Sequence, residues 1–219
     1  MRHRRRTYRR LLPGVVGALA AVGSIAATGG SAGAAPRPVS IAGDQHSTAV
    51  VERANLALAA HDRFSVTGTP GDFVAYLGAR DATADAVAWE MQLEPADLRA
   101  AWSKADLQHQ EALLAALTQL GVQYRYATSE PGVGFDCSGL TAFAWGRAGL
   151  DLTRQSGAQI NAAARRDEAS AVAGDLAQYP GHVMLYLGVG DAIVHASNPS
   201  TDVALSFVSR SVRFGDPTG

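Results

Sequence analysis

One cysteine and two histidines in the second half of the chain could form a nucleophile and its base. Cys137 is the only cysteine among 219 residues, and it directly follows Asp136. Asp136 is predicted to cap a helix, which places Cys137 in the first helical turn. There the unpaired backbone N–H groups and the helix dipole favour a thiolate over a thiol. A cysteine nucleophile also needs a base, and His182 and His195 are the only histidines that follow it. Together these residues predict acyl-transfer chemistry.

The two histidines are expected to share one face of a β-hairpin. Strand signals cover residues 182–187 and 192–196. Side chains alternate along a strand, so an even-numbered loop places both imidazoles on the same face. A two-residue turn would pair Tyr186 with His195 and keep the histidines apart. A four-residue loop pairs Met184 with His195 and makes the histidines diagonal neighbours, roughly 7–8 Å apart at the backbone. We therefore predict the wider loop, or one with a bulge.

The elements around these residues predict an α+β fold. Apolar spacing favours helices over residues 46–61, 82–91 and 95–102, with a break at Leu93–Pro95. Asp72 is expected to cap a further short helix, and Ser103–Asp106 resembles a capping box for a helix that reaches Leu120. A strand at residues 176–179 precedes the hairpin. Helices followed by an antiparallel meander are typical of an α+β domain.

The first 34 residues are predicted to be a signal peptide. Six arginines within the first ten positions are followed by an apolar, Ala- and Gly-rich stretch over residues 11–30 and by a small-residue site at 32–34. Pro13 and several glycines argue against a membrane anchor, and a basic arm for nucleic acid would not explain the apolar run. Residues 35–45 are interpreted as a linker. The route of export, Sec or twin-arginine, stays open.

The charge of the chain argues against a nucleic-acid partner. It carries 19 Lys and Arg against 20 Asp and Glu, and the predicted signal peptide contains six of the arginines and none of the acids. The mature chain is thus acidic, which disfavours binding to nucleic acid. Its single cysteine allows no intramolecular disulfide. His46, His61 and His109 show no metal-ligand spacing, and we interpret them as surface or packing residues.

Several motifs resemble the NlpC-type cell-wall cysteine peptidases, a bacterial branch of the papain-like fold. The resemblance covers about Ala105–Arg213, and its motifs occur in the family's order. They are Gly121-Val-Gln-Tyr-Arg-Tyr126, Phe135-Asp-Cys-Ser-Gly-Leu140, Leu152-Thr-Arg154 with Gln159, Gly174-Asp-Leu176, Gly181-His-Val-Met-Leu-Tyr-Leu-Gly188 and Ile193-Val-His-Ala196. Ala127 and Thr128 stand where the family usually has glycines, and Thr153 replaces a common proline. These departures put substrate preference in doubt rather than reaction type.

The resemblance implies a role for each matching residue. Cys137 becomes the nucleophile, His182 its general base and then acid, and His195 the residue that orients His182. Tyr124 would help to stabilise the oxyanion, together with the Cys137 N–H. In the same way, Asp136 and Ser138 would lie near the site for the substrate's free amino end, although capping alone explains Asp136. No metal and no organic cofactor is implied.

These observations predict an exported two-part protein with a papain-like domain over residues 103–219 and an all-α segment over residues 46–102. The resemblance implies a secreted or wall-associated cysteine endopeptidase that hydrolyses peptidoglycan stem peptides, between D-glutamate and the diamino acid. A thiol acyltransferase on the same fold and a non-catalytic wall-binding protein are the alternatives. No stable membrane insertion is expected after signal cleavage. The role of residues 46–102, whether inhibitory, wall-binding or structural, and the oligomeric state stay open.

Overall fold

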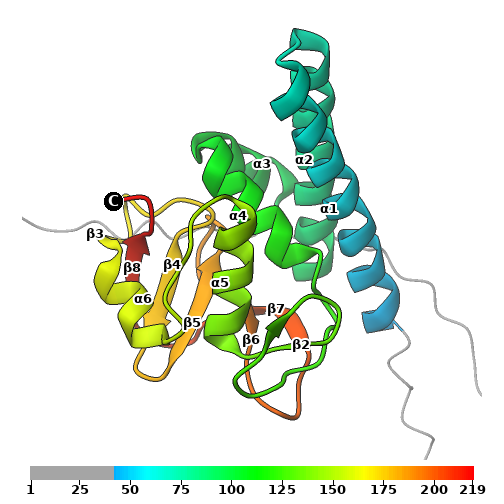
Figure 1. Cartoon of the computed structure of the whole chain (residues 1–219). Helices are drawn as coiled ribbons and strands as arrows, with labels where there is room; N and C mark the ends of the chain where they lie inside the picture. The colour runs from blue at the N-terminus through cyan, green and yellow to red at the C-terminus, as the bar shows by residue number, and fades with distance from the viewer. Residues whose placement is uncertain (1–41) are drawn as a thin grey trace, which may run out of the picture. The chain divides into compact units, whose positions relative to one another are not determined.

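The computed structural model describes the backbone of residues 42–219 and the side chains from residue 47 onward. The predicted signal peptide, most of the predicted linker and the side chain of His46 lie outside the described residues. Within residues 42–219, no helix combines the length and the apolar character that a membrane crossing requires. The described chain forms six α-helices and eight short strands, which agrees with the α+β prediction (Figure 1).

Four helices precede the first strand, and their bounds differ in part from those predicted. They are α1 (Ala42–Thr67), α2 (Pro70–Met91), α3 (Pro95–Lys104) and α4 (Leu107–Leu117). The predicted short helix capped by Asp72 and the predicted piece over 82–91 were wrong as separate elements, because α2 is continuous through both. Its N-cap is Thr69, whose hydroxyl accepts from the Asp72 N–H at 3.2 Å. The two pieces are linked by residues rich in alanine, which has the highest helix propensity. Alanine adds little to an apolar pattern, so the pattern did not show that the helix continues.

The start of α4 also corrects a prediction. Ser103 is not its cap, since the Ser103 hydroxyl donates to the Ala100 carbonyl near the end of α3. The cap is Asp106, whose carboxylate accepts from the His109 N–H at 2.9 Å. The helix ends at Leu117 rather than Leu120, with Thr118 as its C-cap. The predicted break between α2 and α3 is confirmed.

The sheet has six antiparallel strands in the order β3-β8-β4-β5-β6-β7. Three of them were predicted: β4 (Leu176–Tyr179), β5 (His182–Tyr186) and β6 (Ala192–Ala196). The sequence pattern missed β3 (Ala164–Arg166), β7 (Val203–Phe207) and β8 (Arg213–Asp216), which are short or only partly buried. A separate pair, β1 (Ser129–Glu130) and β2 (Gly134–Phe135), leads into α5 (Cys137–Arg147), and α6 (Ser156–Ala162) follows.

Alternation along the strands gives the sheet two differently covered faces. Val183, Leu185 and Val194 belong to the main hydrophobic cluster, which also contains Leu140 and Ala144 of α5. Met184, Tyr186 and Ile193 form a second, smaller cluster on the opposite face. The turn between β4 and β5 lies at the same end of the sheet as the N-terminus of α5 (Figure 1). This arrangement brings the two predicted catalytic segments to one end of the fold.

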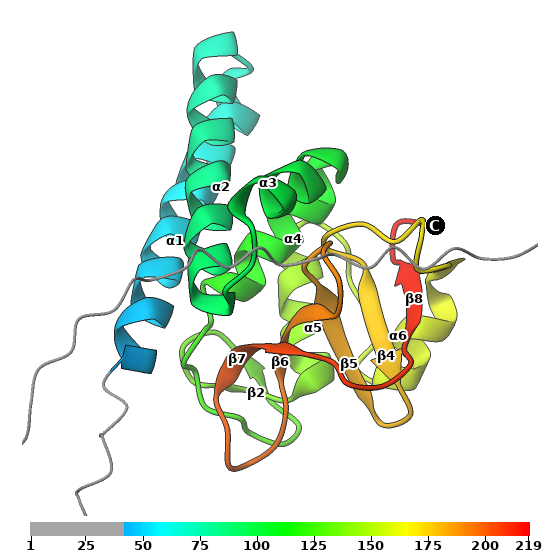
Figure 2. The ribbon, with the colours of Figure 1, turned by 180° about the vertical axis from the view of Figure 1, so that it is seen from behind.

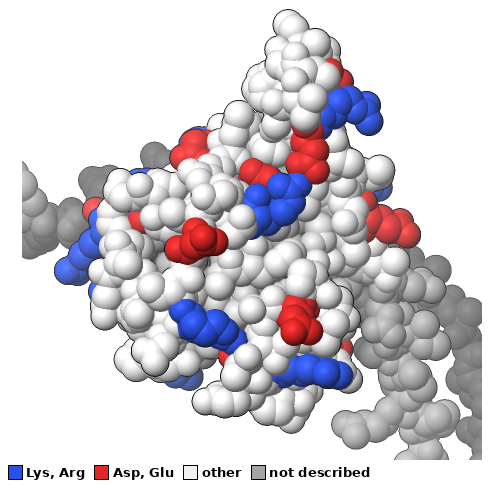
Figure 3. Space-filling model, in the orientation of Figure 1, with Lys and Arg blue, Asp and Glu red and all other residues white. Residues whose placement is uncertain are grey.

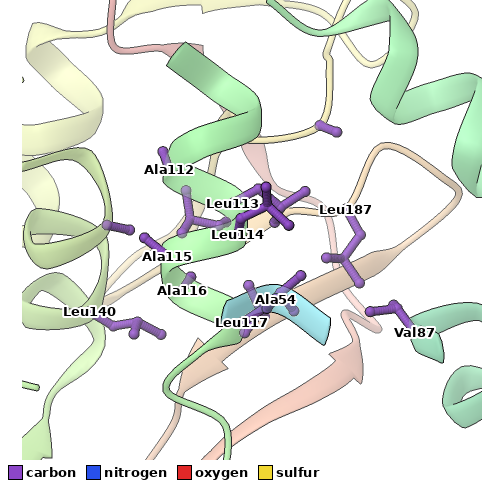
Figure 4. Packing of buried hydrophobic residues seen from close by; sticks show 14 of the residues in the cluster. Ala54, Val87, Ala112, Leu113, Leu114, Ala115, Ala116, Leu117, Leu140 and Leu187 are labelled. Carbon is purple, nitrogen blue, oxygen red and sulfur yellow. The ribbon is translucent and has the colours of Figure 1, made fainter. Parts of the chain in front are cut away.

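Helix α4 lies at the centre of the main cluster. Its residues 112–117 are almost fully buried, and Leu140 of α5, Leu187 after β5, Ala54 of α1 and Val87 of α2 surround it (Figure 4). The helical segment and the sheet thus share one continuous core.

His109 of α4 also occupies the centre of an ion cluster that the sequence did not predict. Its side chain is 1% exposed, with Nδ1 2.9 Å from Asp106 and Nε2 3.2 Å from both Asp175 and Asp216. Burial favours a neutral ring, but hydrogen bonds with Asp175 and Asp106 outweigh it and raise the pKa of His109. Asp175 follows Gly174, where a Cβ would lie 2.6 Å from the His109 carbonyl oxygen. His109 is therefore a packing residue that joins α4 to the sheet through charge.

Candidate active site

Cys137 occupies the first turn of α5, as the sequence predicts. Asp136 is the N-cap, and its Oδ1 accepts from the Gly139 N–H at 2.8 Å. Cys137 is partly exposed. Among the described residues, the backbone N–H groups of Cys137 and Ser138 have no hydrogen-bond acceptor, as is usual at the start of a helix. A free N–H beside the sulfur is the donor that a developing oxyanion requires.

Arg154 holds the Asp136 carboxylate from the loop between α5 and α6. Its Nη1 donates to Oδ1 at 2.7 Å and its Nη2 to Oδ2 at 2.6 Å, which is the bidentate geometry of a strong ion pair. The Ala127 N–H donates to Oδ2 at 2.8 Å. Ser138 joins this network, since its hydroxyl accepts from Arg154 Nη1 at 2.8 Å and lies 3.2 Å from Asp136 Oδ1. Donors from three segments, the loop with Ala127, the first turn of α5 and the loop with Arg154, thus fix the residues on both sides of Cys137.

The charge of Asp136 is retained in the folded protein. Burial alone would raise its pKa, but hydrogen bonds from Arg154 and from the Gly139 N–H hold the pKa below its usual value. The carboxylate is therefore ionised and already paired with a cation from the same chain. The binding of a substrate's amino end by Asp136 and Ser138 stays a prediction. The contacts that Asp136 makes with Arg154 and with the Gly139 N–H support a positioning role for this residue. The motif that contains Arg154 was visible in the sequence, but its ion pair with Asp136 was not predicted.

Gln159 and Gly139 also fix the first turn of α5. The buried Gln159 amide donates to the carbonyls of Ser138 at 2.9 Å and Thr153 at 2.8 Å, and its oxygen accepts from Thr141 at 2.6 Å. A Cβ on Gly139 would lie 2.1 Å from the Thr128 carbonyl oxygen, so only glycine allows this approach. The start of α5 is thereby locked to the loops on either side.

The two histidines meet as the four-residue loop predicts. Leu185 pairs with Val194 and Tyr186 with Ile193, the register in which Met184 faces His195. His182 Nε2 lies 3.0 Å from His195 Nδ1. The predicted loop length and ring contact are therefore confirmed.

The environment of the histidine pair favours neutral rings. Burial, then the neighbouring His195, and then Arg210 lower the pKa of His182 to about 4. Burial also lowers the pKa of His195. Because His182 uses Nε2 toward His195, its Nδ1 is the nitrogen that can accept a proton. A donating Nε2–H on His182 then requires His195 Nδ1 to accept.

One pocket contains Cys137 and reaches the turn that precedes β5. It has a volume of about 460 Å³, and its lining includes Tyr124, Cys137, Arg154 and Gly181, the neighbour of His182. No hydrogen bond joins Cys137 Sγ to either imidazole in the described part of the chain. Burial and the Asp136 carboxylate raise the pKa of Tyr124, so its hydroxyl keeps its proton. The structure thus brings Tyr124, Asp136, Cys137 and Ser138 together in one pocket, whose lining also includes the residue that precedes His182.

Within residues 47–219, two groups of side chains have the composition of a metal site. They are His109 with Asp175 and Asp216, and His61 with Asp62 and Glu111. Arg166 pairs with both carboxylates of the first group, and Arg147 with both of the second. Each pair of carboxylates already has a guanidinium counter-ion. We interpret both groups as structural ion clusters.

Figure 3 shows how charged side chains are distributed on one face of the molecule. On the face drawn in Figure 3, acidic and basic side chains are interspersed among larger uncharged areas. Within the lining of the Cys137 pocket, the charged side chains are those of the Asp136–Arg154 pair.

The segment that contains the candidate site matches a known protein family. Residues 121–212 match the model of the NlpC/P60 family. The match is to an NlpC/P60 domain over less than half of the chain. The match begins at Gly121 rather than near Ala105, so α4 precedes it in sequence while lying in the same core. All six predicted site residues fall inside the NlpC/P60 match.

Curated relatives match stretches of similar length. Peptidoglycan endopeptidase RipB of Mycobacterium tuberculosis is 43% identical over 83 residues, which are 36% of this chain and 34% of RipB. The bifunctional muramidase/DL-endopeptidase CwlT of Bacillus subtilis is 34% identical over 90 residues, or 37% of this chain and 27% of CwlT. The chain spans about a third or less of the length of these two relatives.

A solved structure of the peptidoglycan hydrolase RipB from M. tuberculosis aligns with a TM-score of 0.47 and 24% identity, over 85% of this chain and 93% of that one. The P60 domain of antigen MAP1204 from M. avium subspecies paratuberculosis aligns with a TM-score of 0.46 and 28% identity, over 50% of this chain and 94% of that one.

Proposed function

We propose that the protein is a secreted cysteine endopeptidase that hydrolyses peptidoglycan stem peptides. The observation that carries the proposal is the pairing of His182 and His195 at 3.0 Å, together with a pocket that both Cys137, at a helix N-terminus, and Gly181, the residue before His182, line. A nucleophile, a base and an orienting group are the three parts that acyl transfer through a cysteine requires. The match of residues 121–212 to the NlpC/P60 family supports the same chemistry.

The first half of the reaction forms a thioester. His182 Nδ1 takes the proton of the Cys137 thiol, and the sulfur attacks the amide carbonyl carbon. The His182 Nε2–H continues to donate to His195 Nδ1, which stabilises the imidazolium. The carbonyl oxygen, now negative, is held by the free Cys137 N–H and the protonated Tyr124 hydroxyl. His182 then protonates the leaving amine, and the C–N bond breaks.

The second half returns the enzyme to its starting state. His182, neutral again, removes a proton from water, and the hydroxide attacks the thioester carbonyl. The C–S bond breaks, the thiolate recovers its proton from His182, and a carboxylic acid leaves. The Asp136–Arg154 pair contributes by fixing the turn that carries Cys137 rather than by proton transfer.

The substrate class rests on the resemblance and on the relatives. RipB is named a peptidoglycan endopeptidase and CwlT a muramidase/DL-endopeptidase. We assign this chain to the bond between D-glutamate and the diamino acid, and we place it outside the cytoplasm or at the cell wall. Residues 46–102 are proposed as a distinct helical segment in front of the peptidase domain of residues 103–219.

The pH dependence should reflect a base with a depressed pKa. The neutral form of His182 is the base, and its pKa is about 4. We expect kcat/KM to stay level from neutral pH down to about pH 5 and to fall below about pH 4 as the ring is protonated. A pH–rate profile with circular dichroism at each pH checks this. An acid limb near pH 6.5 with the fold intact contradicts the buried, neutral base.

Product analysis on purified sacculi tests the proposed function. We expect the protein to release muropeptides that each gain one water, with incorporation of ¹⁸O from labelled water into the new carboxylate. Cys137→Ala should release none, while Asp151→Ala, which changes an exposed residue, should match the wild type.

The alternatives predict other products. A ligated product without ¹⁸O would identify an acyltransferase, and unchanged muropeptides would favour a non-catalytic wall-binding protein. Alkylation adds an independent readout, since an activated Cys137 should react with iodoacetamide at pH 6 faster than a free thiol.

A further inference from the structure

The segment between β7 and β8 crosses the sheet on the face opposite α5 (Figure 2). We call residues 208–212 the strap. Its first residue is anchored by a hydrogen bond from the Val208 N–H to the Asp191 carbonyl at 2.9 Å. Val208 and Val212 pack on the small cluster formed by Met184 and its neighbours. Because both ends are held, the middle of the strap lies against the strands that carry the histidines.

Arg210, in the middle of the strap, begins a stack of side chains that ends on the histidine pair. Its Cζ lies 4.5 Å from the centre of the Tyr179 ring, within the range of a cation–π contact. The Tyr179 ring lies 5.2 Å from that of His182, and the two residues are direct partners across β4 and β5. The His182 ring in turn lies 5.1 Å from that of His195.

We propose that Arg210 is a positioning residue for His182 and holds its imidazole in place through Tyr179. The proposal rests on the proposed function of His182 as the base. No carboxylate pairs with Arg210 in the described part of the chain, although five other arginines there have such a partner. Arg210 instead lines a hollow of about 100 Å³ together with Tyr179 and His195.

Few side chains face the His182 ring, so the effect of Arg210 on the pKa of that ring can be measured separately. His195 faces it from β6, Tyr179 from β4 and Arg210 from the strap, while Cys137 of α5 shares the pocket of the adjacent Gly181. After burial and His195, Arg210 is the third cause that lowers the pKa of His182. It is the permanent cation among these groups, so its removal changes the charge near the ring without changing the ring's own contacts with His195.

The experiment compares Arg210→Gln, Arg210→Lys and the matched control Arg213→Gln. Arg213 is exposed at the start of β8, directly after the strap, and its guanidinium donates to Asn161. The His182 ring is titrated by NMR in the full chain, with its signal assigned from a His182→Gln variant. We expect Arg210→Gln to raise the pKa of His182 by about 0.5–1, while Arg210→Lys and Arg213→Gln leave it unchanged. This readout does not depend on activity, so it stands even if the proposed function fails.

Kinetics test the positioning role separately from the charge. At pH 7.5 the ring is neutral in every variant, and we expect roughly threefold to tenfold losses of kcat for both Arg210 variants, because neither glutamine nor lysine reproduces the planar stack on Tyr179. Arg213→Gln should retain wild-type kcat. If Arg210→Gln matches Arg213→Gln in both the titration and kcat, the inference is overturned.

Discussion

Replacement of His182 by alanine is expected to lower kcat/KM on stem-peptide substrates by about 10³–10⁴. The ring supplies both the base for Cys137 and the acid for the leaving amine, and no other imidazole in the described chain lies beside it except His195. Steady-state kinetics on a muropeptide of defined sequence measure the loss. A His182→Ala protein within tenfold of the wild type would show that this imidazole is not the base.

Variants of His195 separate orientation from proton transfer. His195→Leu removes the acceptor that faces His182 Nε2 at 3.0 Å, whereas His195→Asn can present an amide oxygen near the same place. We expect the leucine variant to lose more activity than the asparagine variant, and both to lose less than His182→Ala. Equal losses for the two His195 variants would contradict the orienting role. Thermal melts of all three proteins establish that the fold is retained.

Replacement of Asp175 by alanine is expected to lower the free energy of unfolding by about 3–5 kcal/mol. The carboxylate is fully buried, accepts from the Val172 N–H at 2.8 Å and contacts both His109 and Arg166. Its removal leaves the cationic side chains of His109 and Arg166 without this carboxylate partner. Urea unfolding followed by circular dichroism gives the difference, with Asp151→Ala as the exposed control. A loss below 1 kcal/mol would contradict the structural importance of the cluster.

The size of that loss should depend on pH with a definite sign. Because the native pKa of His109 is raised above its usual value, the folded state binds the proton more tightly than the unfolded chain. The stabilisation is therefore fully present below about pH 6.5 and is lost as the pH rises through the native pKa. We expect Asp175→Ala to cost more at pH 5.5 than at pH 9. The low pKa of His182 affects both proteins alike and cancels in the comparison.

The errors in the predicted helices have a common origin. Predicted boundaries relied on apolar periodicity, which is weak where alanine fills the inward-facing positions, as in the middle of α2. The cap of α4 was misplaced because Ser103 and Asp106 are both good capping residues, and only the bond from Ser103 to the Ala100 carbonyl decides between them. The missed strands β7 and β8 are short and partly exposed, so their pattern resembles that of loops.

Short-range chemistry in the sequence was sufficient for the turn at Cys137 and for the histidine hairpin. The Asp136 cap depends on residues within three positions of one another, and the register of β5 and β6 depends on four loop residues and the alternation of side chains. Both features were predicted and both are present in the structure. Local geometry of this kind is encoded by neighbouring residues, so it can be recognised before the fold is known.

The tertiary structure decided which distant side chains meet. Arg154 reaches Asp136 across 18 positions, His109 reaches Asp175 across 66, and the strap brings Arg210 onto Tyr179. Each of these contacts depends on how helices and loops pack on the sheet, and no spacing along the chain indicates it. The partner of a buried ionisable group determines whether that group is charged and how much free energy its burial costs. The residue types that could do chemistry were therefore visible in the sequence, whereas their electrostatic environment came only from the packing.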